Sequence, residues 1–192
     1  LMRSSAASDV YKRQHLAALA AGFGEGDEVI VSSITFAASS NCVLYAGAKP
    51  VFADINPETY NIDPASIRKL ITPRTKAVVA VDFTGQAVEL DEIREICKEH
   101  NLLLIEDAAH AIGTTYKGQP VGSLADMTCF SFHPVKTVTA GEGGALLPMM
   151  KSCIAICCVC VRMALPEIRK RWYILPTHAG ITSRWNWALT IE

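Results

Sequence analysis

Two apolar runs in this 192-residue sequence, 102–105 and 127–132, are each followed by side chains that could do chemistry. The residues after the first run include Glu106, Asp107 and His110. The residues after the second run are His133, Pro134, Val135 and Lys136, and glycines follow at 141, 143 and 144. Ligands of parallel sheets bind beyond the carboxyl ends of the strands. If both runs are such strands, an acid, a histidine and a lysine gather at one edge.

This set of residue types suits pyridoxal phosphate (PLP) chemistry. A lysine forms a Schiff base with the cofactor aldehyde, and a carboxylate keeps the pyridine nitrogen protonated so that the ring accepts electrons. Position alone does not decide the matter, because Lys136 could be a solvated surface residue and Asp107 could cap a following helix.

Three longer segments are more specific than these single residues. They read GDEVIVSSITFAASSNCVLYAGAKPVFADI, VDFTGQAVELDEI and LLLIEDAAHAIGTTYKGQPVGSLADMTCFSFHPVKTVTAGEGGAL. Over about 130 residues they resemble the DegT-type PLP-dependent sugar aminotransferases. Within that family the likeness is greatest to the 4-aminotransferases of pseudaminic-acid biosynthesis, and FSFHPVK followed by GEGG is its strongest element.

The resemblance implies a role for each of five residues. Lys136 is the Schiff-base lysine and the base that moves a proton, and Asp107 pairs with the pyridinium nitrogen. His110 contacts the ring's O3′ side, Phe36 stacks on the pyridine face, and Ser131 contacts the phosphate. Without the motifs, Phe36 could be a core aromatic, Ser131 a polar strand residue and His110 a helix histidine. A lysine at position 136 favours transamination, because some family members that act as dehydratases carry histidine there.

The elements that position these residues alternate along the chain, which predicts an α/β fold with a mostly parallel sheet and helices on both faces. The predicted strands are Glu28–Val31, Pro50–Ile55, Ala77–Phe83, Leu102–Ile105, Met127–Phe132 and Gly144–Leu147. The predicted helices are His15–Phe23, Ala37–Ala46, Pro64–Ile71 and Leu90–His100. Asp63 precedes the third helix as its cap. The resemblance identifies the fold as an incomplete fold-type-I PLP transferase, the large domain of the aspartate-aminotransferase type.

Composition narrows the class of protein further. The chain is 50% hydrophobic and 19% charged with a net charge of −1, which gives no support to nucleic-acid binding. No apolar run reaches the roughly 18 residues of a membrane span, so we expect a cytoplasmic protein with no membrane partner. Four of the seven cysteines crowd into residues 153–160 with no second pair, so no metal site is expected.

Both ends of the chain depart from the family pattern. The segment DVYKRQ can be encoded by DNA resembling a transposon end used in sequencing libraries, so residues 1–14 are interpreted as a non-native leader. The family's Gly-Thr turn, which holds the cofactor phosphate, is absent there. From Pro148 onward, codons read one frame over can encode the family's SHGITRD and LGFNYR segments. We therefore expect a partial PLP-binding domain at 15–147 and an out-of-frame tail at 148–192, and a fragment with little activity of its own.

The resemblance implies a reaction for the parent protein. L-glutamate supplies the amino group, and the acceptor is the C4 ketone of a UDP-linked 4-keto-6-deoxy-N-acetylhexosamine. A homodimer is implied because family sites are shared between subunits. Three alternatives remain: a DegT-type enzyme for another keto sugar or for C3, a non-catalytic PLP-binding or regulatory protein, and a plain nucleotide-binding domain. The last lacks a GxGxxG turn.

Overall fold

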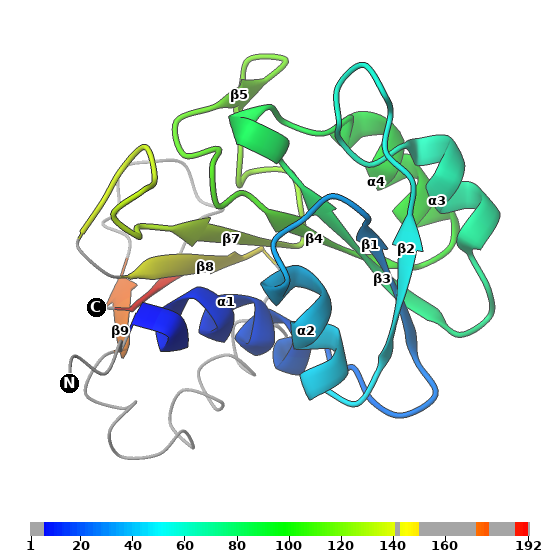
Figure 1. Ribbon diagram of the computed structural model, residues 1–192, viewed down its shortest axis with the longest axis horizontal. Helices are drawn as coiled ribbons and strands as arrows, with labels where there is room; N and C mark the ends of the chain where they lie inside the picture. The colour runs from blue at the N-terminus through cyan, green and yellow to red at the C-terminus, as the bar shows by residue number, and fades with distance from the viewer. Residues whose placement is uncertain (1–5, 141–142, 150–171, 177–186, 192) are drawn as a thin grey trace.

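The computed structural model describes residues 6–140, 143–149, 172–176 and 187–191. A single sheet forms the centre of this part, with helices on both faces (Figure 1). Its strands are β1 (Glu28–Ser32), β2 (Lys49–Ala53), β3 (Thr75–Val81), β4 (Leu103–Asp107), β7 (Met127–Ser131), β8 (Gly144–Pro148), β9 (Trp172–Pro176) and β10 (Trp187–Ile191). They lie in the order β2-β1-β3-β4-β7-β8-β10-β9. A small separate hairpin joins β5 (Thr115–Tyr116) to β6 (Gln119–Pro120).

The first five strands of this order run parallel, as the alternation of strands and helices predicts. Their runs are apolar on both faces: Val29, Ile30 and Val31 of β1 are each 0% exposed. A strand that is apolar throughout is stable only where both faces are covered. β8 reverses direction and pairs antiparallel with β7. The predicted mostly parallel α/β fold is confirmed.

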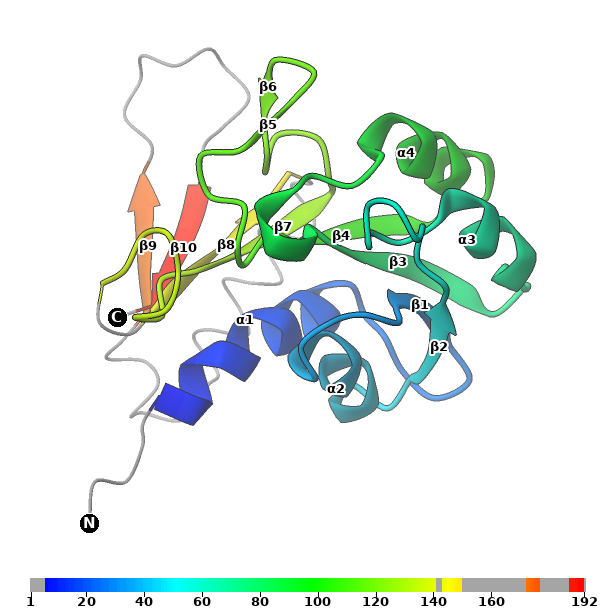
Figure 2. The same ribbon diagram turned by 45° about the horizontal axis from the view of Figure 1, so that its top comes forward.

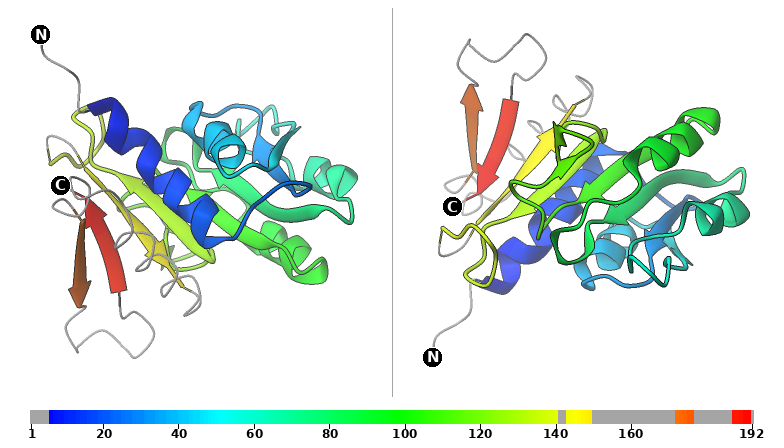
Figure 3. Two further views of the ribbon diagram at one scale, coloured as in Figure 1. Left: turned by 90° about the horizontal axis from the view of Figure 1, so that it is seen from below. Right: turned by 90° about the horizontal axis from the view of Figure 1, so that it is seen from above.

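Helices cover the two faces of the sheet in pairs (Figure 2). They are α1 (Ala6–Ala20), α2 (Ala38–Tyr45), α3 (Pro64–Leu70) and α4 (Leu90–Glu99). One core packs α1 and α2 against side chains such as Val31 and Ile105, and the other packs α3 and α4 against Ile30 and Leu104. Figure 3 shows α1 and α2 on one side of the strands and α4 on the other. Alternate strand residues thus point into different cores.

The predicted helices agree with these bounds except at the first. Asp63 caps α3 as expected, and its side chain accepts a hydrogen bond from Ala65 N at 2.9 Å. Helix α1 begins at Ala6, nine residues before the predicted start, and crosses the boundary drawn at residue 14. Arg13 and Gln14, at 1% and 4% exposure, are buried, and they donate hydrogen bonds to Gly143 O and Asp107 Oδ2. The non-native origin of residues 1–14 stays a prediction.

The predicted out-of-frame tail lies largely outside the described residues. Of it, the structure describes 148–149 and the two strands β9 and β10, which pair antiparallel with each other. β10 also pairs with β8, through Leu189 and Leu146 among others. Among the described helices, none is long and apolar enough to cross a membrane.

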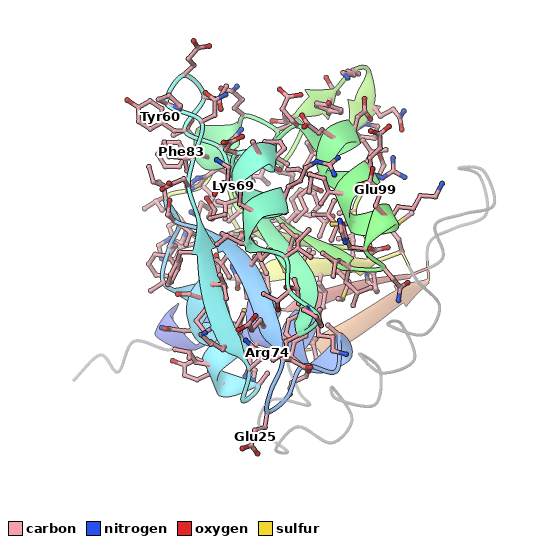
Figure 4. All side chains as sticks on the ribbon, turned by 90° about the vertical axis from the view of Figure 1, so that its right-hand side faces the viewer. Glu25, Tyr60, Lys69, Arg74, Phe83 and Glu99 are labelled. Atoms are coloured by element: carbon pink, nitrogen blue, oxygen red, sulfur yellow. The ribbon has the colours of Figure 1, made fainter. Side chains whose placement is uncertain are left out.

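The two edges of the sheet differ in what they carry. Tyr60 and Phe83 lie at the edge where the parallel strands end, and Glu25 and Arg74 lie at the opposite edge (Figure 4). At the latter edge Glu28 binds Arg74 at 2.8 Å and Lys49 at 3.3 Å, an ion-pair cluster that ties strand starts together. The chemistry-bearing residues of the sequence are at the other edge.

Candidate active site

A cavity of about 520 Å³ lies beyond the carboxyl ends of β1, β3, β4 and β7. All five residues predicted from the family resemblance line it: Phe36, Asp107, His110, Ser131 and Lys136. His133 also lines the cavity, and the lining residues that sequence reasoning did not select include Arg13, Gln14, Thr35 and Phe83. The rule that ligands bind beyond the carboxyl ends of parallel strands therefore led to the edge of the sheet at which this cavity lies.

Asp107 is the most tightly held of these side chains. It ends β4, where it pairs with Val81 of β3, and it is 4% exposed. Its Oδ2 accepts hydrogen bonds from Ser39 Oγ at 2.7 Å and from Gln14 Nε2 at 3.1 Å. Its Oδ1 accepts one from Ala109 N at 3.3 Å. A tight turn rather than a helix follows Asp107, so the helix-cap alternative does not apply.

Lys136 lies in a turn after β7, with its backbone N–H donating to His133 O at 2.9 Å. Its Nζ lies 2.6 Å from His110 Nε2. Partial burial lowers the pKa of Lys136 below its usual value, and the charge of Arg13 lowers it further against the opposing effect of Asp107. A lowered pKa raises the share of neutral amine, which is the nucleophilic form.

His110 shares this electrostatic setting. Burial lowers its pKa first and the charge of Lys136 second, while Asp107 acts in the opposite direction. A neutral imidazole beside an ammonium accepts a hydrogen bond at Nε2 and can take up a proton that the lysine releases. The 2.6 Å contact therefore joins a lysine and a histidine whose pKa values are both lowered.

Ser131 and Phe36 both line the cavity but differ strongly in how exposed their side chains are. Ser131 ends β7 and is 2% exposed, and its Oγ accepts a long hydrogen bond of 3.5 Å from His133 N. Phe36 follows β1 and precedes α2, and it is 57% exposed at the rim. Phe36 is therefore not the core aromatic that the sequence alone left open as an alternative.

Two contacts to Asp107 escaped the sequence reasoning. Ser39 lies on the first turn of α2, 68 positions from Asp107, and no local signal in the sequence places the two together. Gln14 lies in the segment interpreted as a leader, which removed it from consideration. Its amide places Nε2 against Asp107, and its Oε1 is buried without a hydrogen-bond partner among the described residues.

The cysteines described by the structure lie apart from the cavity. Cys42, Cys97 and Cys129 are buried and not joined to one another, and burial raises the pKa of Cys42 and of Cys97 to about 12. Across residues 6–140 and the other described segments, no three metal-ligating side chains converge. The cysteine cluster at 153–160 lies outside the described residues.

Comparison with known proteins identifies the relatives of this arrangement. GDP-perosamine synthase of Caulobacter vibrioides is 53% identical over 132 residues, which are 69% of this chain and 36% of that protein. The sugar aminotransferase Spr1654 of Streptococcus pneumoniae, in its PLP form, matches 69% of this chain and 38% of its own at 37% identity and a TM-score of 0.65. PseC of Helicobacter pylori, an aminotransferase of pseudaminic-acid biosynthesis, matches 92% of this chain and 47% of its own at 31% identity and a TM-score of 0.72.

A family model also matches a large part of this chain. Residues 12–172 match the DegT/DnrJ/EryC1/StrS aminotransferase family along most of the chain. The chain spans about a third of the length of the curated relatives it matches. The family resemblance stated from the motifs is confirmed, and this chain belongs to the DegT/DnrJ/EryC1/StrS aminotransferase family.

Proposed function

We propose that the parent protein is a PLP-dependent aminotransferase that moves the amino group of L-glutamate to the C4 ketone of a UDP-linked 4-keto-6-deoxy-N-acetylhexosamine. The observation that carries the proposal is that Asp107 and Lys136, from different strand ends, line one cavity of about 520 Å³. Asp107 is fixed by Ser39 and Lys136 lies against His110, so both groups have defined positions in the cavity.

The residues of the cavity fit PLP. When bound, the cofactor supplies an aldehyde and an electron-accepting ring, which allow a proton to leave the substrate carbon. Asp107 Oδ1 has one donor at 3.3 Å and keeps acceptor capacity for a pyridinium N–H. Phe36 presents its ring at the rim, and Ser131 offers a buried hydroxyl to the phosphate.

Lys136 has two tasks in this proposal. As a neutral amine it would hold the cofactor through its aldehyde, with loss of water, and as a free amine it would move a proton at the substrate carbon. The lowered pKa of Lys136 suits both tasks, because a permanently protonated amine could do neither. His110, with Nε2 at 2.6 Å from Nζ, holds the amine in position.

The names of relatives support the sugar substrate. PseC acts in pseudaminic-acid biosynthesis, which favours the UDP-linked amino sugar. A second candidate is a GDP-linked 4-keto sugar, favoured by the 53% identity to GDP-perosamine synthase. We further propose that the protein works in the cytoplasm as a homodimer, because the resemblance to its family implies sites shared between subunits.

The test uses the full-length gene with its reading frame corrected. Purified protein should show the visible absorbance of lysine-bound PLP, and Lys136→Ala should abolish it. Lys117→Ala is the matched control, because this surface lysine pairs with Asp91 at 2.7 Å, away from the cavity. A wild-type protein that stays colourless with added PLP would overturn the proposal.

The same protein, supplied with glutamate, should aminate one member of a panel of UDP- and GDP-linked 4-keto sugars, with the new amine at C4. Amination of the GDP sugar alone would establish the second candidate. Amination at C3 would place the protein in another branch of the family. Bound PLP with no amination of any sugar would support a non-catalytic role.

A further inference from the structure

Two carboxyl groups face each other behind the cavity, on the side of the sheet that packs against α4. Asp82 follows β3 and Glu106 lies in β4, the neighbouring strand, and both are 0% exposed. Their side chains lie within hydrogen-bonding reach of each other. Neither residue is among those that line the cavity.

The hydrogen bonds around the two groups leave one oxygen of each uncommitted. Asp82 Oδ1 accepts from Val88 N at 3.0 Å. Glu106 Oε2 accepts from Gly122 N at 3.1 Å and from Thr128 Oγ1 at 3.0 Å. The other two oxygens, Asp82 Oδ2 and Glu106 Oε1, are buried and have no donor among the described residues.

Two facing acceptors need a proton between them. A buried acceptor with no donor costs free energy, and two ionised carboxylates side by side repel each other as well. One proton on Asp82 Oδ2, donated to Glu106 Oε1, satisfies both oxygens at once.

The surrounding charges favour this state. Burial and the charge of Glu106 raise the pKa of Asp82 to about 9, and the charge of Asp107 adds to the effect. Burial also raises the pKa of Glu106. Among the described residues, the groups that donate hydrogen bonds to the two carboxyls are uncharged: the backbone N–H groups of Val88 and Gly122 and the hydroxyl of Thr128.

We propose that Asp82 and Glu106 share one proton, and that this acid pair positions the loop carrying Phe83 against the strand that leads to Asp107 and His110. The pair is a positioning device of this chain, and the inference does not depend on which sugar the cavity accepts.

The loop after Asp82 is packed directly on the cavity residues, so holding it matters there. Gly85 adopts φ +91°, and a Cβ at this position would lie 2.8 Å from the carbonyl oxygen of His110. Thr114 Oγ1 donates to Gly85 O at 2.9 Å. Asn61 Oδ1 accepts from Phe83 N at 2.9 Å. A shift of this loop therefore moves Phe83 and presses on the backbone of His110.

Amide substitutions test the shared proton, because an amide fixes in place the donor that a protonated carboxyl supplies. In Asp82→Asn the amide oxygen accepts from Val88 N and the amide nitrogen donates to Glu106. In Glu106→Gln the amide nitrogen donates to Asp82 in the same way. Each single variant should unfold at nearly the urea concentration of wild type near pH 4, where the unfolded carboxyl is also protonated, and should be more stable than wild type at pH 7.

The double variant Asp82→Asn with Glu106→Gln sets two amide nitrogens against each other with no acceptor between them. Its unfolding constant should exceed the product of the two single effects by about tenfold or more, the cost of a buried unpaired donor. If the free-energy change of the double variant instead equals the sum of the two single changes, or if neither single variant gains stability on wild type between pH 4 and pH 7, the shared proton is wrong.

The pH dependence of unfolding separates a shared proton from simple packing. The native pair keeps a proton that an unfolded aspartate releases near pH 4, so the stability that it contributes is lost as pH rises toward 9. The unfolding constant of wild type should rise relative to that of Asp82→Asn by up to about tenfold per pH unit in this window. Parallel pH profiles for the two proteins would overturn the proposal even if both fold well.

Discussion

Lys136 Nζ lies 2.6 Å from His110 Nε2, and the two residues come from different strand ends 26 positions apart. The contact joins the turn after β7 to the turn after β4. Each group lies in the field of Asp107, and the pKa of each is lowered chiefly by burial. At this distance the charge of Lys136 adds to the lowering of the pKa of His110.

Replacing Lys136 by methionine should raise the pKa of His110. The charge of Lys136 lowers this pKa, and methionine keeps the volume of the side chain while removing the charge. The measurement is an NMR titration of the histidine ring protons, with His110→Gln to assign the signal. Lys117→Met removes a distant surface charge and should leave the titration unchanged. A His110 signal that titrates identically in Lys136→Met and wild type would contradict the coupling.

Replacing Ser39 by alanine should destabilise the chain by about 1–3 kcal/mol, because Asp107 Oδ2 then loses its 2.7 Å donor in a buried site. Thr35 Oγ1, which donates to Ser39 Oγ at 2.7 Å, loses the nearer of its two acceptors and keeps Phe36 O at 3.3 Å. Ser40→Ala is the matched control on the same helix, since its hydroxyl donates to the nearby backbone carbonyl Ala37 O at 3.1 Å. Urea denaturation measures both variants, and equal stabilities would show that Ser39 does not hold Asp107.

Gly85→Ala should be more costly than Gly113→Ala. Both glycines have positive φ values, +91° and +84°, so each alanine pays about 1–2 kcal/mol for a left-handed backbone. Only at Gly85 would the new Cβ meet the carbonyl oxygen of His110, at 2.8 Å, while Gly113 has nothing within 4 Å. The difference between the two unfolding free energies isolates the close approach. If the two variants are equally stable, the loop that carries Phe83 can move away from His110 O without a loss of folding free energy.

Sequencing the source DNA should reveal one base lost or gained near the codon of Leu147, with the family's segments restored downstream in the corrected frame. The reason is that the encoded SHGITRD and LGFNYR segments appear only one frame over. An uninterrupted frame through this region would show that the tail is native. The same sequence should show whether transposon-derived bases precede the codon of His15.

The amino-acid sequence determined much of the scaffold and the edge at which the site lies. Apolar runs such as Leu102–Ile105 are central strands because only a doubly covered strand keeps such residues from water. Asp63 caps α3 because its side chain reaches a backbone N–H two residues away. These features depend on neighbours in the chain, and local pattern is sufficient to read them. The motifs around Asp107 and Lys136 then indicated which strand ends carry the chemistry.

Only the tertiary structure decided which side chains touch at that edge. Ser39 and Asp107 are 68 positions apart, and Gln14 and Asp107 are 93 apart. Asp82 and Glu106 meet because β3 and β4 pair in one register, with Val81 opposite Asp107. A shift of one residue would turn each of these side chains to the opposite face of the sheet. Contacts of this kind follow from register and packing over the whole domain, and no local pattern contains them.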